Sequence, residues 1–334
     1  MPAMWLRTLL IAPPVLVATL WASAALWIDG PDLPILAGIL SAGFTALTIG
    51  VFVWLRPLRR SLVVFSGLFL VVLAWWFAQT PENNRSWQPN VARLPSATID
   101  GDLVTIRNIR NFDYQSETDY REKWEERSYD LSRLVGVDTF LSYWGSPWMA
   151  HTVMSWAFDD GQHLAVSIET RKEEGESYSA ILGFFHQFEL YYVVADERDL
   201  VGLRTNHRNE DVYLYHLAAG QDTARAVLVD YLEEINQLSE TPSWYNALTH
   251  NCTTSIWDHF QNVSAGRRFD WRILANGWID EMAYSRGFID TSLPFSELRR
   301  RSAITAKAQA IPAGMNFSEW IRQDLPGGHD PLPR

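Results

Sequence analysis

Three long apolar runs at the N-terminus constrain this chain more than any other feature of its sequence. They cover roughly residues 9–28, 35–55 and 61–77, with short links between them. Each run approaches the ~20 residues that an α-helix needs to cross a ~30 Å hydrocarbon core. A cleaved signal peptide would have a single short apolar core and a small-residue cleavage site. The sequence therefore predicts three transmembrane helices within residues 1–79.

Basic residues in the links predict the orientation of these helices. Arginines precede the first run and separate the second from the third, namely Arg7, Arg56, Arg59 and Arg60. The other link, residues 29–32, has no basic residue. Because cytoplasmic loops carry the excess of Lys and Arg, we expect a cytoplasmic N-terminus and an exterior part from about residue 80. In a bacterium this part lies in the periplasm, and the helices lie in the inner membrane.

The exterior part is acidic. Four of the 28 basic and two of the 39 acidic residues belong to the first 79, which leaves 24 basic and 37 acidic residues and a formal charge of −13. This balance argues against a nucleic-acid partner, because such proteins present basic patches to phosphates. The length is ample for a sizeable core. The oligomeric state is left open by the sequence.

Periodicity predicts an α+β domain outside the membrane. After a polar linker, residues 80–98, we expect strands near 103–109, 149–158, 164–170, 191–195 and 212–217. They form an antiparallel sheet of four to six strands. The run Asp159-Asp160-Gly161 predicts a hairpin between the second and third of them. Helices are expected at 222–238, from 252, and at 271–284. The domain covers residues 99–323, and a disordered tail covers 324–334.

The chain contains a single cysteine, Cys252, in the run His250-Asn251-Cys252-Thr253-Thr254, where a loop turns into an apolar helix. A lone thiol forms neither an internal disulfide nor a multi-cysteine metal site, so reactivity is its best remaining use. The N–H groups and the positive potential of a helix N-terminus stabilise a thiolate and bind an oxyanion. We therefore assign Cys252 as a nucleophile, with Asn251 and Thr253 as substrate-binding or oxyanion residues.

A nucleophilic cysteine needs a histidine that takes and returns its proton. His151 is the best candidate, because it opens a predicted core strand over residues 152–158. The alternative is that His151 is a structural residue at a sheet edge whose hydrogen bonds are satisfied there. The rival base is His250, but consecutive side chains at a helix entry rarely face each other.

A third group should orient the imidazole. A three-residue hairpin turn would place Glu169 opposite His151, whereas a two-residue turn would place Thr170 there. We choose Glu169. The alternative is that Glu169 is only a charge that keeps an edge strand soluble. Arg171 and Arg204 are candidate anion-binding residues or structural arginines. The sequence shows no Gly-rich phosphate loop, no His-x-x-x-His pair and no CxxC, so we predict neither a cofactor nor a metal.

Several motifs together resemble the Lnb N-terminal periplasmic domain family over about residues 106–322. They are, in order, His151, Ser167–Arg171, Gly175–Tyr178, Tyr192–Asp199, Leu203–Asn206, Val212–Tyr215 and Asn251–Thr254. The resemblance implies N-acylation of bacterial lipoproteins with a catalytic cysteine and histidine, which map onto Cys252 and His151. The order of histidine strand and cysteine helix is also similar to circularly permuted NlpC-type papain-like proteins, which implies that fold.

These observations lead to a thiol acyltransferase as the first hypothesis, with phospholipid and lipoprotein substrates and a thioester on Cys252. A lipid substrate predicts an apolar groove near Cys252, which the Trp-rich segment 144–156 would help to build. A papain-like cell-wall peptidase or amidase is the alternative and would need an open polar groove. The third hypothesis is a membrane scaffold whose thiol is inert.

Overall fold

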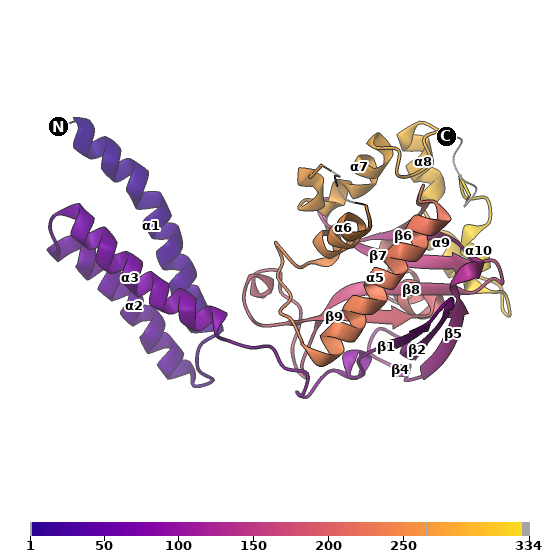
Figure 1. Cartoon of the computed structure of the whole chain (residues 1–334), viewed down its shortest axis with the longest axis horizontal. Helices are drawn as coiled ribbons and strands as arrows, with labels where there is room; N and C mark the ends of the chain where they lie inside the picture. Colours follow the sequence, from indigo (N-terminus) through magenta and orange to yellow (C-terminus); the bar gives the residue numbers. More distant parts are fainter. Residues whose placement is uncertain (1, 265, 267, 329–334) are drawn as a thin grey trace. The chain divides into compact units, whose positions relative to one another are not determined.

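The computed structural model of this chain describes residues 2–264, 266 and 268–328. The chain divides into two compact units (Figure 1). The membrane unit comprises residues 1–82 together with 178–188, and the sheet unit comprises residues 83–177 together with 189–334. Of the predicted disordered tail, residues 329–334 lie outside the described residues.

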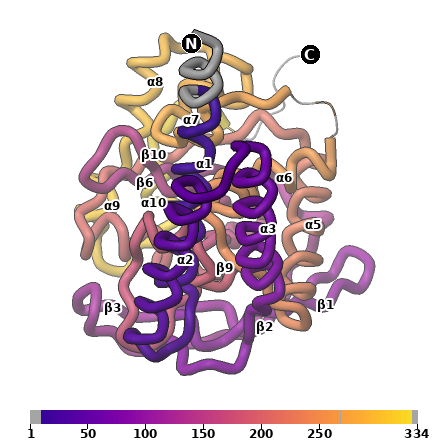
Figure 2. Tube along the Cα trace, turned by 90° about the vertical axis from the view of Figure 1, so that its left-hand side faces the viewer, coloured from indigo at the N-terminus to yellow at the C-terminus, as the bar shows by residue number. Residues whose placement is uncertain are grey.

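Three long helices form most of the membrane unit, and they confirm the predicted apolar spans. They are α1 Pro2–Ile28, α2 Pro34–Trp54 and α3 Leu58–Phe77. All three are long and apolar enough to cross a bilayer, and they pack side by side (Figures 1 and 2). Small and aromatic side chains, such as Ala22 and Phe65, fill the space between them, whereas Ile35 and Val63 face outward. An apolar outer surface of this kind is what lipid tails cover.

The sheet unit is built on one large sheet. Among the described residues it has eight strands in the order β1-β2-β9-β8-β7-β6-β10, with β5 paired to β2. A separate ribbon joins β3 and β4. The bounds are β1 Ser96–Asp100, β2 Leu103–Arg110, β3 Asp113–Tyr114, β4 Tyr120–Arg121, β5 Trp124–Asp130, β6 Leu134–Tyr143, β7 Ala150–Phe158, β8 His163–Arg171, β9 Glu189–Ala195 and β10 Asp211–His216.

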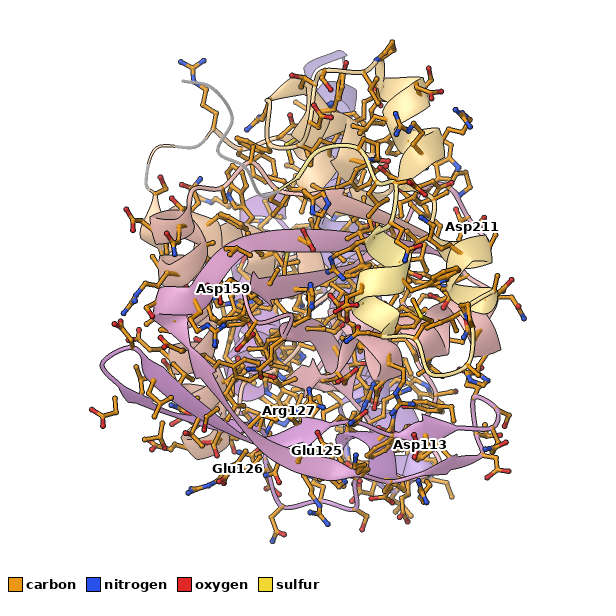
Figure 3. All side chains as sticks on the ribbon, turned by 90° about the vertical axis from the view of Figure 1, so that its right-hand side faces the viewer. Asp113, Glu125, Glu126, Arg127, Asp159 and Asp211 are labelled. Atoms are coloured by element: carbon orange, nitrogen blue, oxygen red, sulfur yellow. The ribbon has the colours of Figure 1, made fainter. Side chains whose placement is uncertain are left out.

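The predicted strand count of four to six was therefore wrong, and so was the purely antiparallel pairing, because β2 pairs with β9 in parallel. β1, β5 and β6 were missed. β5 is rich in charge, and its Glu125, Glu126 and Arg127 lie at the edge of the sheet (Figure 3). Ion pairs such as Arg107 to Glu126 at 2.7 Å hold these side chains. Charge on an edge strand also discourages pairing with another chain.

The predicted hairpin joins β7 and β8. Phe158 N–H donates to the carbonyl of Gln162 at 3.0 Å, so three residues form the turn, and Gly161 within it has a φ of +82°. Glycine adopts this left-handed conformation without the steric cost that a Cβ would add. The ladder pairs Val153 with Ser167. In the same register, two residues further along, Glu169 lies opposite His151.

Helices cover both faces of the sheet (Figure 1). α5 Gln221–Glu240 and α6 Cys252–Val263 contact one face, and α4 Glu197–Gly202, α9 Thr305–Gln309 and α10 Phe317–Arg322 pack with the core of the other. α8 Phe295–Ser302 packs near β10. The short turns are η1 Pro89–Val91, η2 Leu131–Arg133, η3 Leu182–Phe184, η5 Trp271–Ile273 and η6 Asn276–Trp278, with a π-helical turn η4 Leu203–His207.

The helix predicted for residues 271–284 is interrupted. The chain forms η5 and η6 before α7 Ile279–Ser285 begins. Gly277 explains the break, because a Cβ there would lie 2.2 Å from the carbonyl oxygen of Pro147. Its N–H also donates to the carbonyl of Trp148 at 3.1 Å. Close approach of two backbones fixes this turn, and the turn places Asn276 beside the N-terminus of α6.

Candidate active site

Cys252 is the first residue of α6, and a capping box fixes the entry to this helix. The side-chain oxygen of Asn251 accepts from the N–H groups of Thr253 at 2.9 Å and Thr254 at 3.0 Å. In return, Asn251 N–H donates to Thr254 Oγ1 at 2.9 Å. Reciprocal bonds of this kind satisfy N–H groups that a helix start otherwise leaves open. They hold the thiol at the positive end of the helix dipole.

His151 lies at the start of β7, near enough to Cys252 for each of the two groups to shift the pKa of the other. Its Nε2 donates to Ser167 Oγ at 2.6 Å and lies 3.2 Å from Glu169 Oε1. The sequence analysis did not single out Ser167. The hairpin register was its available signal, because Ser167 shares the face of β8 on which Glu169 lies.

Glu169 is held by three side chains. Its Oε1 accepts from Ser167 Oγ at 2.7 Å and from Arg204 Nη2 at 2.7 Å, besides its contact with His151. Arg204 is itself fixed, because its Nη1 donates to the carbonyl of Leu200 at 2.9 Å. Burial raises the pKa of Glu169, but the charges of His151 and Arg204 outweigh this effect and hold the pKa well below its usual range. The carboxylate is therefore ionised at neutral pH.

The charges of this cluster favour a thiolate. Burial opposes the imidazolium form of His151, but Glu169 and the Cys252 thiolate raise the pKa of the histidine to about 9. Burial likewise raises the pKa of the thiol, whereas His151 and hydrogen bonds from Thr152 N–H and Thr253 lower it below its ordinary value. An opposite charge in contact favours the charged form of both partners. The two groups therefore favour each other's charged forms, the thiolate and the imidazolium.

Asn276 is a further side chain at the thiol that the sequence analysis missed. Its Nδ2 lies 4.0 Å from Cys252 Sγ and 3.1 Å from Thr253 Oγ1. Its Oδ1 accepts from Ala150 N–H at 2.9 Å, which fixes the direction of the amide. An oriented amide N–H beside a nucleophile is the kind of donor that stabilises an oxyanion. No sequence signal marked it, because it lies 24 residues beyond Cys252 in a separate turn.

The remaining predicted residues take other positions. Arg171 donates to the carbonyls of Val91 at 3.1 Å and Ala92 at 3.0 Å and to Asn83 Oδ1 at 3.0 Å, so its guanidinium anchors the linker. His250, the rival base, is exposed and contacts Thr249 Oγ1 at 2.9 Å. Of the two candidate arginines, only Arg204 is brought to the cluster around Cys252. It contacts Glu169 there.

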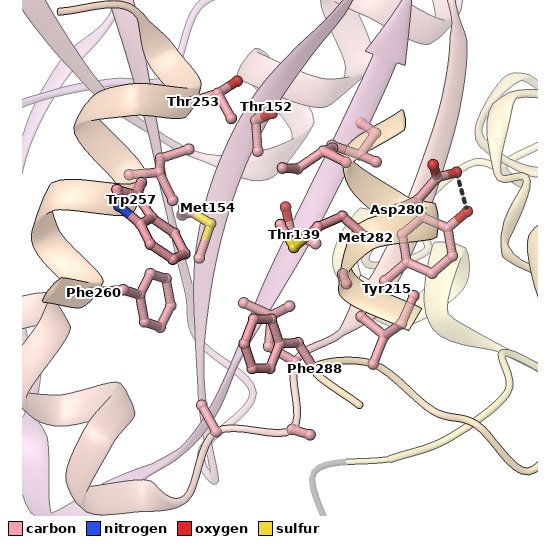
Figure 4. Close-up of a pocket in the computed structure, with 18 of the residues that line it drawn as sticks. Thr139, Thr152, Met154, Tyr215, Thr253, Trp257, Phe260, Asp280, Met282 and Phe288 are labelled. Atoms are coloured by element: carbon pink, nitrogen blue, oxygen red, sulfur yellow. Dashed lines mark hydrogen bonds between the residues drawn. The ribbon is translucent and has the colours of Figure 1, made fainter. Parts of the chain in front are cut away.

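An apolar pocket of about 180 Å³ adjoins the nucleophile. Thr152 and Thr253, the chain neighbours of His151 and Cys252, line one end of it (Figure 4). The other labelled walls are Thr139, Met154, Tyr215, Trp257, Phe260, Asp280, Met282 and Phe288. Of the Trp-rich segment 144–156, Thr152 and Met154 line the pocket. Trp156 instead bonds to the carbonyl of Ala224 at 2.9 Å.

Within the described ranges, no group of three or more His, Cys, Asp or Glu side chains is placed to hold a metal ion. Cys252, His151 and Glu169 bring a thiol, an imidazole and a carboxylate together, and Ser167 and Arg204 both donate to the carboxylate.

Three apolar helices followed by a folded, sheet-rich unit define a membrane protein with a large domain outside the bilayer. Residues 120–277 match the family model described as "Lnb N-terminal periplasmic domain". This part of the chain belongs to that family. The matched segment contains His151, Glu169, Cys252 and Asn276. No curated protein and no solved structure matches the chain. The permuted papain-like fold stays a prediction.

Proposed function

We propose that the protein is a cysteine-dependent acyltransferase that acts on lipid or lipoprotein acyl groups. One observation carries the proposal: Cys252 and His151 lie close enough to shift each other's pKa, and their chain neighbours Thr253 and Thr152 line one end of an apolar pocket. A nucleophile that accepts an acyl chain needs both an activated thiolate and an apolar surface for the chain. We also infer that the helices lie in a bacterial inner membrane, with the N-terminus in the cytoplasm and the catalytic domain in the periplasm.

In the first half-reaction, the Cys252 thiolate attacks the carbonyl carbon of an ester and forms a C–S bond. The carbonyl oxygen becomes an oxyanion, and the Asn276 amide is positioned to donate to it. The C–O bond then breaks, and the alcohol leaves with a proton from His151. Glu169 stabilises the imidazolium before this transfer. The product is a thioester on Cys252.

In the second half-reaction, an amine attacks the thioester carbonyl. His151 takes the proton of the amine, the C–S bond breaks and the thiolate returns. The acyl group leaves as an amide. Water competes with the amine at this stage, so exclusion of water from the thioester decides transfer over hydrolysis. The apolar walls of the pocket favour transfer, and they favour a lipid substrate over the cell-wall peptide of the alternative hypothesis.

The test is an acylation assay on the purified full chain. Incubation with a phospholipid carrying a labelled acyl chain should give an adduct that hydroxylamine releases and that is lost in Cys252→Ser. An added amine-terminated lipopeptide should discharge the adduct as an amide. Release of free fatty acid alone would indicate a hydrolase. If no lipid gives an adduct, or if Cys252→Ser forms it equally well, the proposal is wrong.

The pocket supplies a matched pair of variants for the same assay. Ala283 lines the pocket, and Ala306 is exposed on α9. Ala283→Phe should slow acylation by a long-chain phospholipid about tenfold, which corresponds to ~1.4 kcal/mol of lost binding to the transition state. It should leave a short acetyl ester nearly unaffected, and Ala306→Phe should change neither. Equal losses with both esters would place the acyl chain elsewhere.

A further inference from the structure

The segment between β8 and β9, residues 178–188, packs with the three helices of the membrane unit. Asp29, in the link after α1, is the centre of its polar contacts. Gln187 Nε2 donates to Asp29 Oδ1 at 2.8 Å and to the carbonyl of Ile28 at 3.1 Å. Trp76 Nε1, near the end of α3, donates to the second carboxylate oxygen at 2.7 Å. One carboxylate therefore joins two helix ends to this segment.

Apolar contacts continue this attachment along the helices. Phe185 is 6% exposed and clusters with Ala25 of α1 and Trp76 of α3. The ring of His186 stacks on Trp76 with 3.7 Å between centroids. These contacts lie within about one turn of the helix ends at Ile28 and Phe77. Tryptophan in this part of a membrane helix marks the level of the lipid headgroups.

The same segment presents apolar side chains outward. Ile181 is 69% exposed and Phe184 is 39% exposed. They stand three residues apart at η3, and residues with this spacing share one side of a 3₁₀ turn. The segment Tyr178–Phe188 contains no Asp, Glu, Lys or Arg, although the exterior part as a whole is strongly acidic. Its buried side thus faces the helices, and its other side offers an uncharged apolar edge.

We propose that residues 178–188 form a membrane-contact segment. Phe185 and Gln187 fix it to the helix ends, and Ile181 and Phe184 insert into the headgroup and acyl boundary of the adjoining leaflet. The partner is the bilayer, because the segment packs on the ends of helices whose outer surface lipid covers, beside the tryptophan that marks the headgroup level. The segment begins seven positions after Arg171, the last residue of β8, which is the strand that carries Ser167 and Glu169.

Fluorescence in nanodiscs tests this proposal without a reading of activity. Ile181→Cys and Phe184→Cys, each in the full chain with Cys252→Ser, are labelled with the environment-sensitive dye NBD. Val63→Cys on the outer surface of α3 is the lipid-facing control. Leu103→Cys on β2, 51% exposed, is the apolar control from the sheet unit. Far-UV circular dichroism verifies that each variant retains its fold.

Phospholipids brominated on the acyl chain should quench the labels at 181, 184 and 63 at least twofold, relative to unbrominated lipid. Aqueous iodide should quench the label at 103. It should quench the other three labels only weakly, because the bilayer shields them. Labels at 181 and 184 that iodide quenches as strongly as the label at 103, and that brominated lipid leaves unchanged, would overturn the proposal. Because the readout needs no catalysis, failure of the acyltransferase proposal would leave this result unaffected.

Discussion

At the scale of single residues, the ionisation of Cys252 depends on a chain of neighbours. His151 shifts the pKa of the thiol, Glu169 contacts His151, and Arg204 and Ser167 fix Glu169. Among these, His151 is the residue whose charge acts directly on the thiol. Glu169 acts through the imidazole and is therefore a positioning residue. Its charge determines whether His151 stays protonated when the thiol loses its proton.

Removing that charge should shift the pH profile of the thiol. The raised pKa of His151 means that the imidazolium persists at neutral pH and is lost only as the pH rises towards about 9. In Glu169→Gln this pKa should fall, so the imidazolium should be lost at a lower pH and the change that its loss causes in the rate of iodoacetamide labelling of Cys252 should move to lower pH. Glu126→Gln, an exposed control on β5, should match the wild type. Identical rate profiles for all three proteins would contradict this role of Glu169.

At the scale of elements, a capping box holds the start of α6, where Cys252 is the first helical residue. Asn251 supplies the acceptor for two backbone N–H groups, and its Nδ2 also donates to the carbonyl of Ala247 at 2.8 Å. These bonds use both the Oδ1 and the Nδ2 atom of the side-chain amide. The main contribution of Asn251 is therefore to hold the first turn of the helix. The amide of Asn276, whose Nδ2 lies 4.0 Å from Cys252 Sγ, is the candidate oxyanion donor.

Two substitutions separate the capping role of Asn251 from the effect of a charge at this position. Asn251→Ala removes the cap and should destabilise the domain by ~1 kcal/mol. Asn251→Asp keeps the acceptor and should retain more of the stability, but its negative charge beside the thiolate should slow iodoacetamide labelling. Thermal unfolding in detergent and labelling rates at pH 7 measure the two effects. A wild-type unfolding temperature in Asn251→Ala would show that the cap does not stabilise the domain.

At the scale of the whole molecule, the basic links predict one orientation in the membrane. Arg56, Arg59 and Arg60 lie between α2 and α3, whereas the link after α1 carries Asp29 and Asp32. Basic loops stay in the cytoplasm. A phosphatase reporter that functions only in the periplasm should therefore be active when fused after residue 32 and inactive when fused after residue 57. The opposite pair of activities would invert the orientation and place the catalytic domain in the cytoplasm.

Local patterns predicted the elements of the site well. The Asp-Gly pattern predicted the β7–β8 hairpin but left its turn at two or three residues, and the structure has the three-residue turn that places Glu169 opposite His151. The asparagine before Cys252 marked the start of α6. By contrast, β5 was hidden because its stability depends on ion pairs and on its partner β2, which no local pattern reports.

The sequence by itself determined the three apolar spans, the hairpin and the helix that begins at the lone cysteine, because each depends on interactions between residues close in the chain. Only the tertiary structure brought Asn276 to the thiol, turned Arg171 towards the linker and Arg204 towards Glu169, and enclosed the apolar pocket. Those features arise where segments far apart in the chain pack together. Their geometry is set by shape and by competition for hydrogen-bond partners, and neither leaves a periodic trace in the sequence.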